Sequence, residues 1–438
     1  MDLEGARIDR AVFKDYGESL VGGAIGTNTG TTYMVDLDTG NAFHLILTGN
    51  CTFTFSNPAP SGTACTFTLF LKQDATGSRT ATWPASVVWA GGTAPTLTTT
   101  AKRYDMLTFT TVDGGTRWLG FVGGQNYALA NEIFAATLYT GNGAARSVST
   151  GVNISTHGGM VWFKDRSSAN GHSLFDTARG VSLDLNTAST AADNSVSTRL
   201  TSFDSNGFSI GTNAVVNSSG NSYVAWSFRK AANFFDVVTY TGDGLNNHNI
   251  AHSLGIAPGM IIVKDHGAID NWYVWHRSGG FSGLGGGYLN LTNAFGDQSD
   301  VWQAAPTSTE FSLRNGGANV SGHTYVAYLF AHDTSGAGNI QCGSYTGNGS
   351  ATGPIVTLGW EPQYILWKRA DSANNWFIID KTRGWSGANE LYLYADSSAA
   401  EPASFQISHP TSTGFVIDTA DVSTNANGGT YIYMAIRA

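Results

Sequence analysis

Charged residues are scarce in this 438-residue chain, where Asp, Glu, Lys and Arg together make up only 13% of the positions. Lys and Arg number 23 against 32 Asp and Glu, so the formal net charge is −9, and no basic run occurs. Binding to nucleic acid requires clustered Lys or Arg that neutralise phosphates. The composition therefore argues against a nucleic-acid partner, and the same lack of clustered cations argues against an anionic membrane surface.

Long apolar segments are lacking as well. No stretch approaches the about 20 apolar residues of a membrane helix, and the first ten residues, MDLEGARIDR, do not resemble a secretory signal. We therefore expect no membrane insertion and a chain that folds in a cytoplasm.

Cysteines number only three, which is too few for a disulfide framework and lacks zinc-ligand spacing. Cys51 and Cys65 lie on two runs, CTFTF and CTFTLFL, that read as neighbouring strands. The two thiols could face each other across a hairpin, or they could be two small buried hydrophobes.

Glycine, by contrast, is abundant, with 54 residues, and aromatics make up 12% of the chain. Low charge combined with many β-branched and aromatic residues favours strands. Between residues 139 and 438 no segment shows helical periodicity over eleven residues. The sequence predicts an all-β protein.

One five-residue turn recurs three times along the chain. It reads YTGNG at Tyr139–Gly143, YTGDG at Tyr240–Gly244 and YTGNG at Tyr345–Gly349. Each copy is followed by an apolar run that ends in a lysine, then by an aromatic strand that ends in Asp or His twelve residues later. The lysines are Lys164, Lys264 and Lys368, which we expect at solvated strand ends, and the Asp/His positions are Asp176, His276 and Asp380. Such ordered landmarks indicate an internal repeat.

A repeat of about a hundred residues is too long for a solenoid unit of 20–50 residues and suits a β-sandwich of seven or eight short strands. We predict three tandem, jelly-roll-like β-sandwich repeats, at residues 138–232, 236–333 and 340–438. If each repeat folds separately, neighbours meet over modest, polar surfaces. Deletion of residues 340–438 would then leave the rest folded.

Residues 20–127 are also β-rich but lack the landmarks of the repeat. The runs NAFHLILTG, CTFTFSNP and CTFTLFLKQD alternate apolar and polar residues, and DMLTFTTVDGGTRWLGFVGG reads as a hairpin in which Gly114 or Gly115 supplies a positive φ. We predict a meander of antiparallel strands in a sandwich or a small open barrel.

Two short segments flank this β domain. Residues 1–19 carry eight charges and, if helical, place Ile8, Val12 and Phe13 on one side. Because the segment is too short for a stable lone helix, we expect it to pack on a partner or a symmetry mate, unless it is a frayed terminus. Residues 128–137, ALANEIFAAT, are expected to be a linker with one or two helical turns.

Two blocks carry a family resemblance. The block from VDLDTGNAFHLILTG through TAPTL, with DGGTRWLGFVGG after it, resembles a module of tailed-bacteriophage fibre and adsorption proteins. The block from YTGNG through VWFKDRSSANGHSLFDTARG and SNGFSIG to NSYVAWSF resembles a domain of unknown function, often repeated in tandem in phage tail-fibre-like proteins. Together the two resemblances cover residues from about 31 to 438. The middle repeat departs from the pattern, with His276 in place of the Asp and Gly279 in place of the Arg.

The resemblance implies a virion structural protein of the host-adsorption apparatus, trimeric like most phage fibres and assembled in the host cytoplasm. We expect the N-terminal region to bind other virion proteins and the repeats to bind a host surface glycan or receptor. Two alternatives remain open: a capsid head fibre or decoration protein, and a polysaccharide-degrading tailspike.

No catalytic motif stands out in the sequence. There is no nucleophile elbow, HExxH motif, P-loop or dinucleotide fingerprint, and no pair among the seven Glu suggests glycoside hydrolysis. We therefore expect no enzyme, no cofactor and no metal.

The most specific polar landmarks are two Asp-x-x-Arg turns, Asp176/Arg179 and Asp380/Arg383. Each turn either binds a sugar or a neighbouring subunit, or forms an internal ion pair that fixes the turn. Trp272 and Trp275 are further candidates for ligand binding, because exposed aromatic faces stack on sugar rings.

Overall fold

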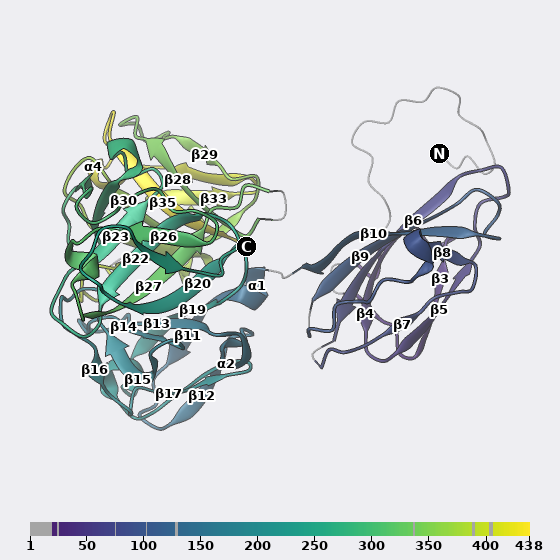
Figure 1. Cartoon of the computed structure of the whole chain (residues 1–438), viewed down its shortest axis with the longest axis horizontal. Helices are drawn as coiled ribbons and strands as arrows, with labels where there is room; N and C mark the ends of the chain where they lie inside the picture. The colour runs from purple at the N-terminus through teal and green to yellow at the C-terminus, as the bar shows by residue number, and fades with distance from the viewer. Residues whose placement is uncertain are drawn as a thin grey trace. The chain divides into compact units, whose positions relative to one another are not determined.

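The computed structural model describes residues 20–23, 26–74, 76–101, 103–127, 130–335, 338–387, 390–402 and 406–438. The chain divides into two compact units, Met1–Leu129 and Ala130–Ala438, called the front domain and the C-terminal domain below. In both, the regular secondary structure consists almost entirely of strands (Figure 1), which confirms the all-β prediction. The expected leader at residues 1–19 lies outside the described residues.

Two sheets form the front domain. The larger contains β1 (Leu20–Val21), β2 (Thr27–Asn28), β4 (Ala42–Leu47), β6 (Cys65–Gln73), β8 (Val87–Trp89), β9 (Tyr104–Thr111) and β10 (Trp118–Tyr127). The smaller contains β3 (Thr32–Asp36), β5 (Cys51–Ser56) and β7 (Ala81–Thr82). One face of each sheet is apolar, and the two faces enclose a core rich in aromatic rings, such as the stacked pair Phe67 and Phe109, whose centroids are 5.1 Å apart.

The pairing in this domain differs from the predicted antiparallel meander. Strands β3 to β6 alternate between the two sheets, so β3 pairs with β5 and β4 with β6, and both pairs are parallel. The reason is that the connecting turns carry the chain across the core, so consecutive strands face each other instead of sharing a ladder. Cys51 and Cys65 therefore lie in opposite sheets, both as free thiols, and the hairpin that would pair them does not exist.

The hairpin predicted near the end of the domain is present. Strands β9 and β10 pair antiparallel, and the turn between them contains Gly114 at φ 66° and Gly115 at φ 82°. Such angles are readily adopted only by glycine.

The C-terminal domain repeats one arrangement in three lobes: lobe 1 (134–229), lobe 2 (235–331) and lobe 3 (340–437). Each lobe is a sandwich of one larger and one smaller sheet. Figure 1 shows the lobes in succession within one body, from the teal strands of lobe 1 through the green of lobe 2 to the yellow of lobe 3.

The larger sheets share one strand order. In lobe 1 it is β11 (Phe134–Thr140), β19 (Ser222–Arg229), β13 (Gly159–Asp165), β14 (Ser173–Asp176), β15 (Gly180–Leu185), β16 (Asn194–Ser195). In lobe 2 it is β20 (Phe235–Thr241), β27 (Thr324–Ala331), β22 (Pro258–Asp265), β23 (Trp272–His276), β24 (Gly285–Tyr288), β25 (Gly296–Asp297). In lobe 3 it is β28 (Ile340–Thr346), β35 (Thr430–Arg437), β30 (Pro362–Arg369), β31 (Phe377–Asp380), β32 (Tyr392–Tyr394).

The smaller sheets complete the sandwiches. They contain β12 (Arg146–Ser149), β18 (Gly207–Ile210) and β17 (Leu200–Asp204) in lobe 1, β21 (His248–Ala251) and β26 (Glu310–Leu313) in lobe 2, and β29 (Ile355–Thr357), β34 (Gly414–Ile417) and β33 (Ser408–Thr411) in lobe 3. Single helical turns connect strands, among them α1 (Ala130–Ile133), α2 (Ile154–His157), α3 (Ala214–Asn217) and α4 (Val422–Asn425). The segment expected to be a linker thus supplies α1 and the start of the edge strand β11.

The recurring five-residue turn holds the end of the first strand of each lobe against the segment that precedes the last strand. In lobe 1 the Tyr139 hydroxyl donates to the Val216 carbonyl at 2.7 Å, and the Asn142 amide donates to Asn217 at 2.9 Å. A Cβ added to Gly141 would lie 2.1 Å from the Ser218 carbonyl oxygen, so only glycine permits this approach. The same contacts recur in lobes 2 and 3, which explains why the chain repeats the motif.

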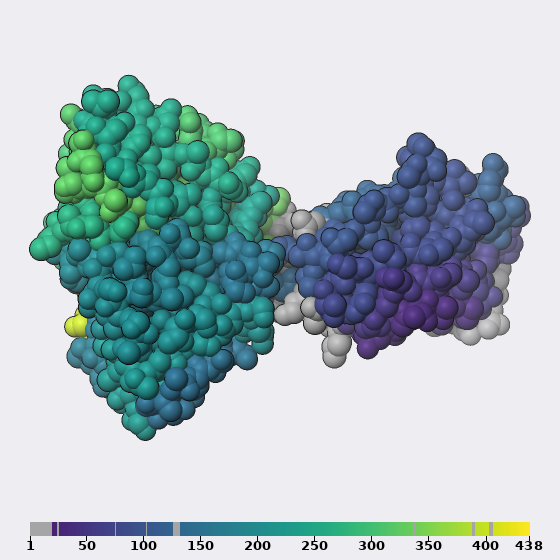
Figure 2. Space-filling model, turned by 60° about the horizontal axis from the view of Figure 1, so that its bottom comes forward, coloured from purple at the N-terminus to yellow at the C-terminus, as the bar shows by residue number. Residues whose placement is uncertain are grey.

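The contacts between lobes differ from the expected modest, polar surfaces. Phe228 of lobe 1 packs against Phe330 of lobe 2 and Tyr364 of lobe 3, with ring centroids 5.7 and 6.0 Å apart, and all three side chains are buried. The central strands β13 and β22 are buried along their whole length, because one face packs in the lobe's own sandwich and the other against neighbouring lobes. On the face shown in Figure 2, the surfaces of lobes 1 and 2 adjoin directly.

Candidate functional site

The first Asp-x-x-Arg turn, Asp176/Arg179, lies at the junction between lobes 1 and 2. The Arg179 Nε donates to Asp176 Oδ2 at 2.7 Å, and the Tyr328 hydroxyl of lobe 2 donates to the same oxygen at 2.7 Å. The other carboxylate oxygen of Asp176 accepts the amides of Ala178 and Arg179. This carboxylate therefore fixes its own turn and also holds the neighbouring lobe.

The second turn, Asp380/Arg383, makes the corresponding junction between lobes 3 and 1. Asp380 Oδ2 accepts from Arg383 Nε at 2.7 Å and from Trp226 Nε1 of lobe 1 at 2.9 Å. The Arg383 guanidinium also reaches Glu401 at 3.0 Å, and its Cζ lies 5.3 Å from the centroid of the Trp226 ring. The side chains of Asp380 and Arg383 are both 0% exposed.

The middle lobe uses His276 at the equivalent position, and its junction explains the substitution. His276 Nε2 donates to the Tyr433 carbonyl of lobe 3 at 3.1 Å, while Nδ1 accepts the Ser278 amide at 3.1 Å. The strand registers place Met434 of lobe 3 where lobes 1 and 2 have Trp226 and Tyr328. Methionine offers no hydrogen to a carboxylate, so an aspartate here would be a buried charge without its donor.

A second set of equivalent contacts closes the three lobes into a ring. A ring N–H of each lobe donates to a backbone carbonyl of another: His172 to Tyr394 at 2.9 Å, Trp272 to Asn186 at 3.2 Å and Trp376 to Tyr288 at 2.8 Å. Backbone amides repeat the pattern: Asp193 to His266 at 2.9 Å, Phe295 to Ala370 at 2.8 Å and Glu401 to Arg166 at 3.0 Å. Each lobe thus contacts both others through the same elements.

All six residues predicted to bind a ligand are engaged within the chain. Asp176, Arg179, Asp380 and Arg383 lie at the junctions just described, and Trp272 donates to lobe 1. Trp275 Nε1 donates to the Gly283 carbonyl at 2.8 Å inside lobe 2. Ligand binding by these side chains stays a prediction that their burial does not favour.

Arg179 does border a cavity of about 400 Å³ between lobes 1 and 2, beside Tyr240 and His266. Its guanidinium lies within 2.7 Å of the Asp176 carboxylate and 3.6 Å of that of Asp193. The positive charge at this cavity is therefore already matched by two carboxylates of the chain.

The three repeated lysines are buried, which corrects the expectation of solvated strand ends. Lys164, Lys264 and Lys368 are at most 1% exposed, and each ammonium donates to two backbone carbonyls of nearby loops. Burial lowers the pKa of each lysine to about 8. The hydrogen bonds from the ammonium groups thus hold these loops against the ends of the strands.

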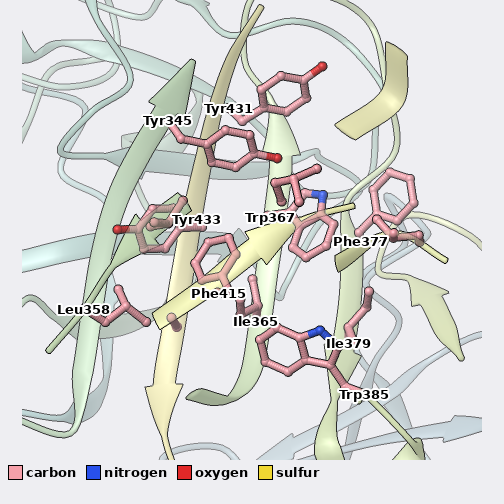
Figure 3. Close-up of a cluster of buried hydrophobic side chains, with 14 of the residues drawn as sticks. Tyr345, Leu358, Ile365, Trp367, Phe377, Ile379, Trp385, Phe415, Tyr431 and Tyr433 are labelled. Atoms are coloured by element: carbon pink, nitrogen blue, oxygen red, sulfur yellow. The ribbon is translucent and has the colours of Figure 1, made fainter. Parts of the chain in front are cut away.

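A cavity that the sequence did not indicate lies in lobe 3. It has a volume of about 240 Å³ and is lined by Phe377, Tyr392, Tyr394, Asp421, Ser423 and Thr424, among others. Figure 3 shows Phe377 at the edge of the buried aromatic cluster that contains Trp367. The strand YLY at Tyr392–Tyr394 was the available signal, since it places two tyrosines on one face.

Within the described part of the chain, no group of three or more His, Cys, Asp and Glu side chains is arranged to hold a metal ion. No helix among the described residues is long and apolar enough to cross a membrane.

Two known families match parts of the chain. Residues 130–437 match the family described as "Domain of unknown function (DUF7483)", and the chain belongs to this family. Residues 28–114 match the family described as "Putative phage tail fibre C-terminal domain". The second match supports a structural protein of the phage tail-fibre type and hence a virion component. No curated protein matches the chain significantly.

The first match bears on the expectation that the chain contains three tandem copies of the family domain. A single match spans all three lobes, so the lobes are parts of one family domain and are not three tandem copies of it.

The buried ion pair at the junction of lobes 3 and 1 can be tested by mutation. Arg383→Met leaves the Asp380 carboxylate buried without its cation, and we expect it to lower the free energy of unfolding by about 3–5 kcal/mol. The double variant Asp380→Asn/Arg383→Met removes both charges and keeps an acceptor for Trp226, so it should recover part of that loss. Urea denaturation of the three proteins measures the difference.

Lys381→Met in the same lobe is the matched control, because its pair with Glu361 is exposed and should contribute under about 1 kcal/mol. Equal losses for Arg383→Met and Lys381→Met would contradict the structural role of the junction.

The histidine at the third junction predicts a dependence of stability on pH. Burial lowers the pKa of His276 from its ordinary value of 6.5 to about 4. Between these pH values the unfolded chain binds a proton that the folded chain excludes, so His276 destabilises the fold as pH falls from 6.5 to 4, by up to about 3 kcal/mol. Gln at position 276 keeps a side-chain N–H donor and does not titrate.

We therefore expect the difference in unfolding free energy between wild type and His276→Gln to shift in favour of the variant as pH falls from 7 to 4. Urea denaturation at several pH values measures it. A difference that is constant with pH would contradict burial of the neutral imidazole.

Proposed function

We propose that the protein is a host-adsorption protein of a tailed-phage virion. The observation that carries the proposal is the match of residues 28–114 to a phage tail-fibre domain. In this proposal the front domain binds other virion proteins and the C-terminal domain binds a surface glycan or receptor of the host.

The C-terminal domain suits a binding role. Its three lobes are held together by buried ion pairs and hydrogen bonds, so it can present a fixed surface to a ligand. The Asp176 and Asp380 side chains are 0% exposed and paired with arginines. Glycoside hydrolysis needs two carboxylates that flank the substrate, and these two buried carboxylates do not supply such a pair.

Competition with intact particles tests the proposal. Host cells are incubated with the purified full-length chain and then with particles that carry it, and unadsorbed particles are counted. We expect the chain to slow adsorption in a concentration-dependent manner. Adsorption that is unchanged at saturating chain would overturn the proposal.

An antibody against residues 345–438, viewed on particles by electron microscopy, distinguishes a tail position from a capsid position. Labelling at the tail is the expected result, and labelling over the capsid would indicate a head fibre or decoration protein instead. Release of reducing ends from host polysaccharide by the purified chain would indicate a tailspike.

We also propose that the full chain forms a homotrimer, which the resemblance to phage fibres implies and which has the closed cyclic symmetry usual for homo-oligomers. Multi-angle light scattering should return three times the chain mass of 46.2 kDa. A single chain mass at micromolar concentration would contradict this.

A further inference from the structure

The cavity of lobe 3 combines apolar rings with polar groups. Strand β32 places Tyr392 and Tyr394 on one face, and the neighbouring strand β31 adds Phe377. The Phe377 ring lies 4.9 Å from that of Tyr394 and 5.5 Å from that of Tyr392, at interplanar angles of 76° and 46°. Both tyrosines are half-buried. Such half-buried tyrosines offer apolar ring surface together with a hydroxyl.

The opposite wall is polar and comes from the turn that contains α4. Asp421 caps this turn by accepting the Ser423 amide at 2.7 Å, and Ser423 and Thr424 complete the wall. Thr424 is 2% exposed, and its hydroxyl has no hydrogen-bond partner among the residues that the structure describes. The polar side chains that this wall can offer to a ligand are therefore those of Asp421 and Ser423.

The aromatic wall packs on the core of the lobe. Trp367 stacks on Phe377 with ring centroids 5.8 Å apart (Figure 3). Trp367 is 0% exposed, so it supports Phe377 from the side of the core.

From these observations we propose that the lobe 3 cavity binds one pyranose unit of a neutral glycan, an inference that rests on the proposed function. The C–H face of a sugar ring packs on the aromatic rings, whose faces carry partial negative charge. The sugar hydroxyls bond to the side chains of Asp421 and Ser423.

Size and charge specify the ligand class. At about 240 Å³, the cavity is smaller than the clefts of about 300–1,000 Å³ that hold drug-sized ligands, so it takes a single sugar ring. Its described lining contains the Asp421 carboxylate and no cation, which disfavours an acidic sugar. Affinity for one ring is weak, and several copies on a particle would raise it through multivalency.

The equivalent place in lobe 2 is filled by the chain itself. There Tyr273 replaces Phe377, and Gly317 replaces Ser423. A Cβ on Gly317 would lie 1.8 Å from the Tyr273 hydroxyl oxygen, so the phenol occupies the space that is open in lobe 3.

In lobe 1 the same place is occupied by an ion pair. Asp184 stands where lobe 3 has Tyr392, and the Arg199 guanidinium binds its carboxylate. Sugar binding is therefore a property of lobe 3 among the three lobes.

The test uses the full-length chain and saturation-transfer NMR with the methyl glycosides of glucose, galactose, mannose and N-acetylglucosamine, with glucuronic acid as an acidic probe. At least one neutral glycoside should bind, and glucuronic acid should not. Phe377→Tyr/Ser423→Gly rebuilds the lobe 2 arrangement, so it should reduce that signal at least tenfold without unfolding the lobe.

Tyr394→Ala should cause the same loss, and Tyr288→Ala is its matched control. The two tyrosines occupy equivalent positions, and each backbone carbonyl accepts a ring N–H from another lobe. Tyr288→Ala should keep sugar binding. Thermal unfolding of both variants shows whether the fold is retained.

Binding of none of the neutral glycosides would overturn the inference, as would binding that Tyr394→Ala and Phe377→Tyr/Ser423→Gly leave unchanged. Its failure is distinguishable from failure of the proposed function. If the chain still competes with particles for host cells but binds no glycoside, adsorption stands and the sugar site is wrong. If the chain does not compete at all, the proposed function itself fails.

Discussion

The structure of the C-terminal domain depends on buried carboxylates that each serve two purposes. Asp176 and Asp380 fix the turn that follows their own strand, and both also accept a hydrogen bond from an aromatic side chain of another lobe. Burial of an ionised carboxylate is costly unless a cation and donors surround it. Because the donors come from two lobes, neither lobe can satisfy its carboxylate alone, and the three lobes form one closed domain.

The need to pair a buried carboxylate also explains why lobe 2 has a histidine at the position where lobes 1 and 3 have an aspartate. Where lobe 3 presents Met434, the neighbouring lobe has His276, whose neutral ring donates to a backbone carbonyl. His172 makes the same kind of bond to Tyr394, and burial lowers its pKa to about 3. Each histidine is thus held in one tautomer by an acceptor and a donor on opposite sides. Lobe 3 also differs from lobe 2 in its cavity. Phe377 and Ser423 leave open the space that Tyr273 fills in lobe 2.

Much of the fold was predictable from the sequence, because alternation and recurring turns report local structure directly. The three sets of landmarks, the β9–β10 hairpin and the all-β class follow from them. The association of the lobes was not predicted. Runs such as MVWFK at Met160–Lys164 are apolar on both faces, which indicates a strand covered on both sides, but they do not identify the partner. The parallel pairing of the front domain was missed because short turns suit either a hairpin or a crossing between sheets. The lobe 3 cavity depends on side chains from β31, β32 and the α4 turn, whose proximity requires the fold.

The closed ring is tested most directly by removing one lobe. A chain that ends at residue 339 lacks Tyr364, Asp380 and the Tyr433 carbonyl, which contact Phe228, Trp226 and His276. If the ring account is correct, lobes 1 and 2 of this truncated chain have no cooperative thermal transition, and hydrogen exchange in β13 and β22 is unprotected while the front domain stays folded. A truncated chain whose lobes 1 and 2 unfold cooperatively, with protection in those strands equal to that in the full chain, would show that the lobes fold separately and would contradict the account.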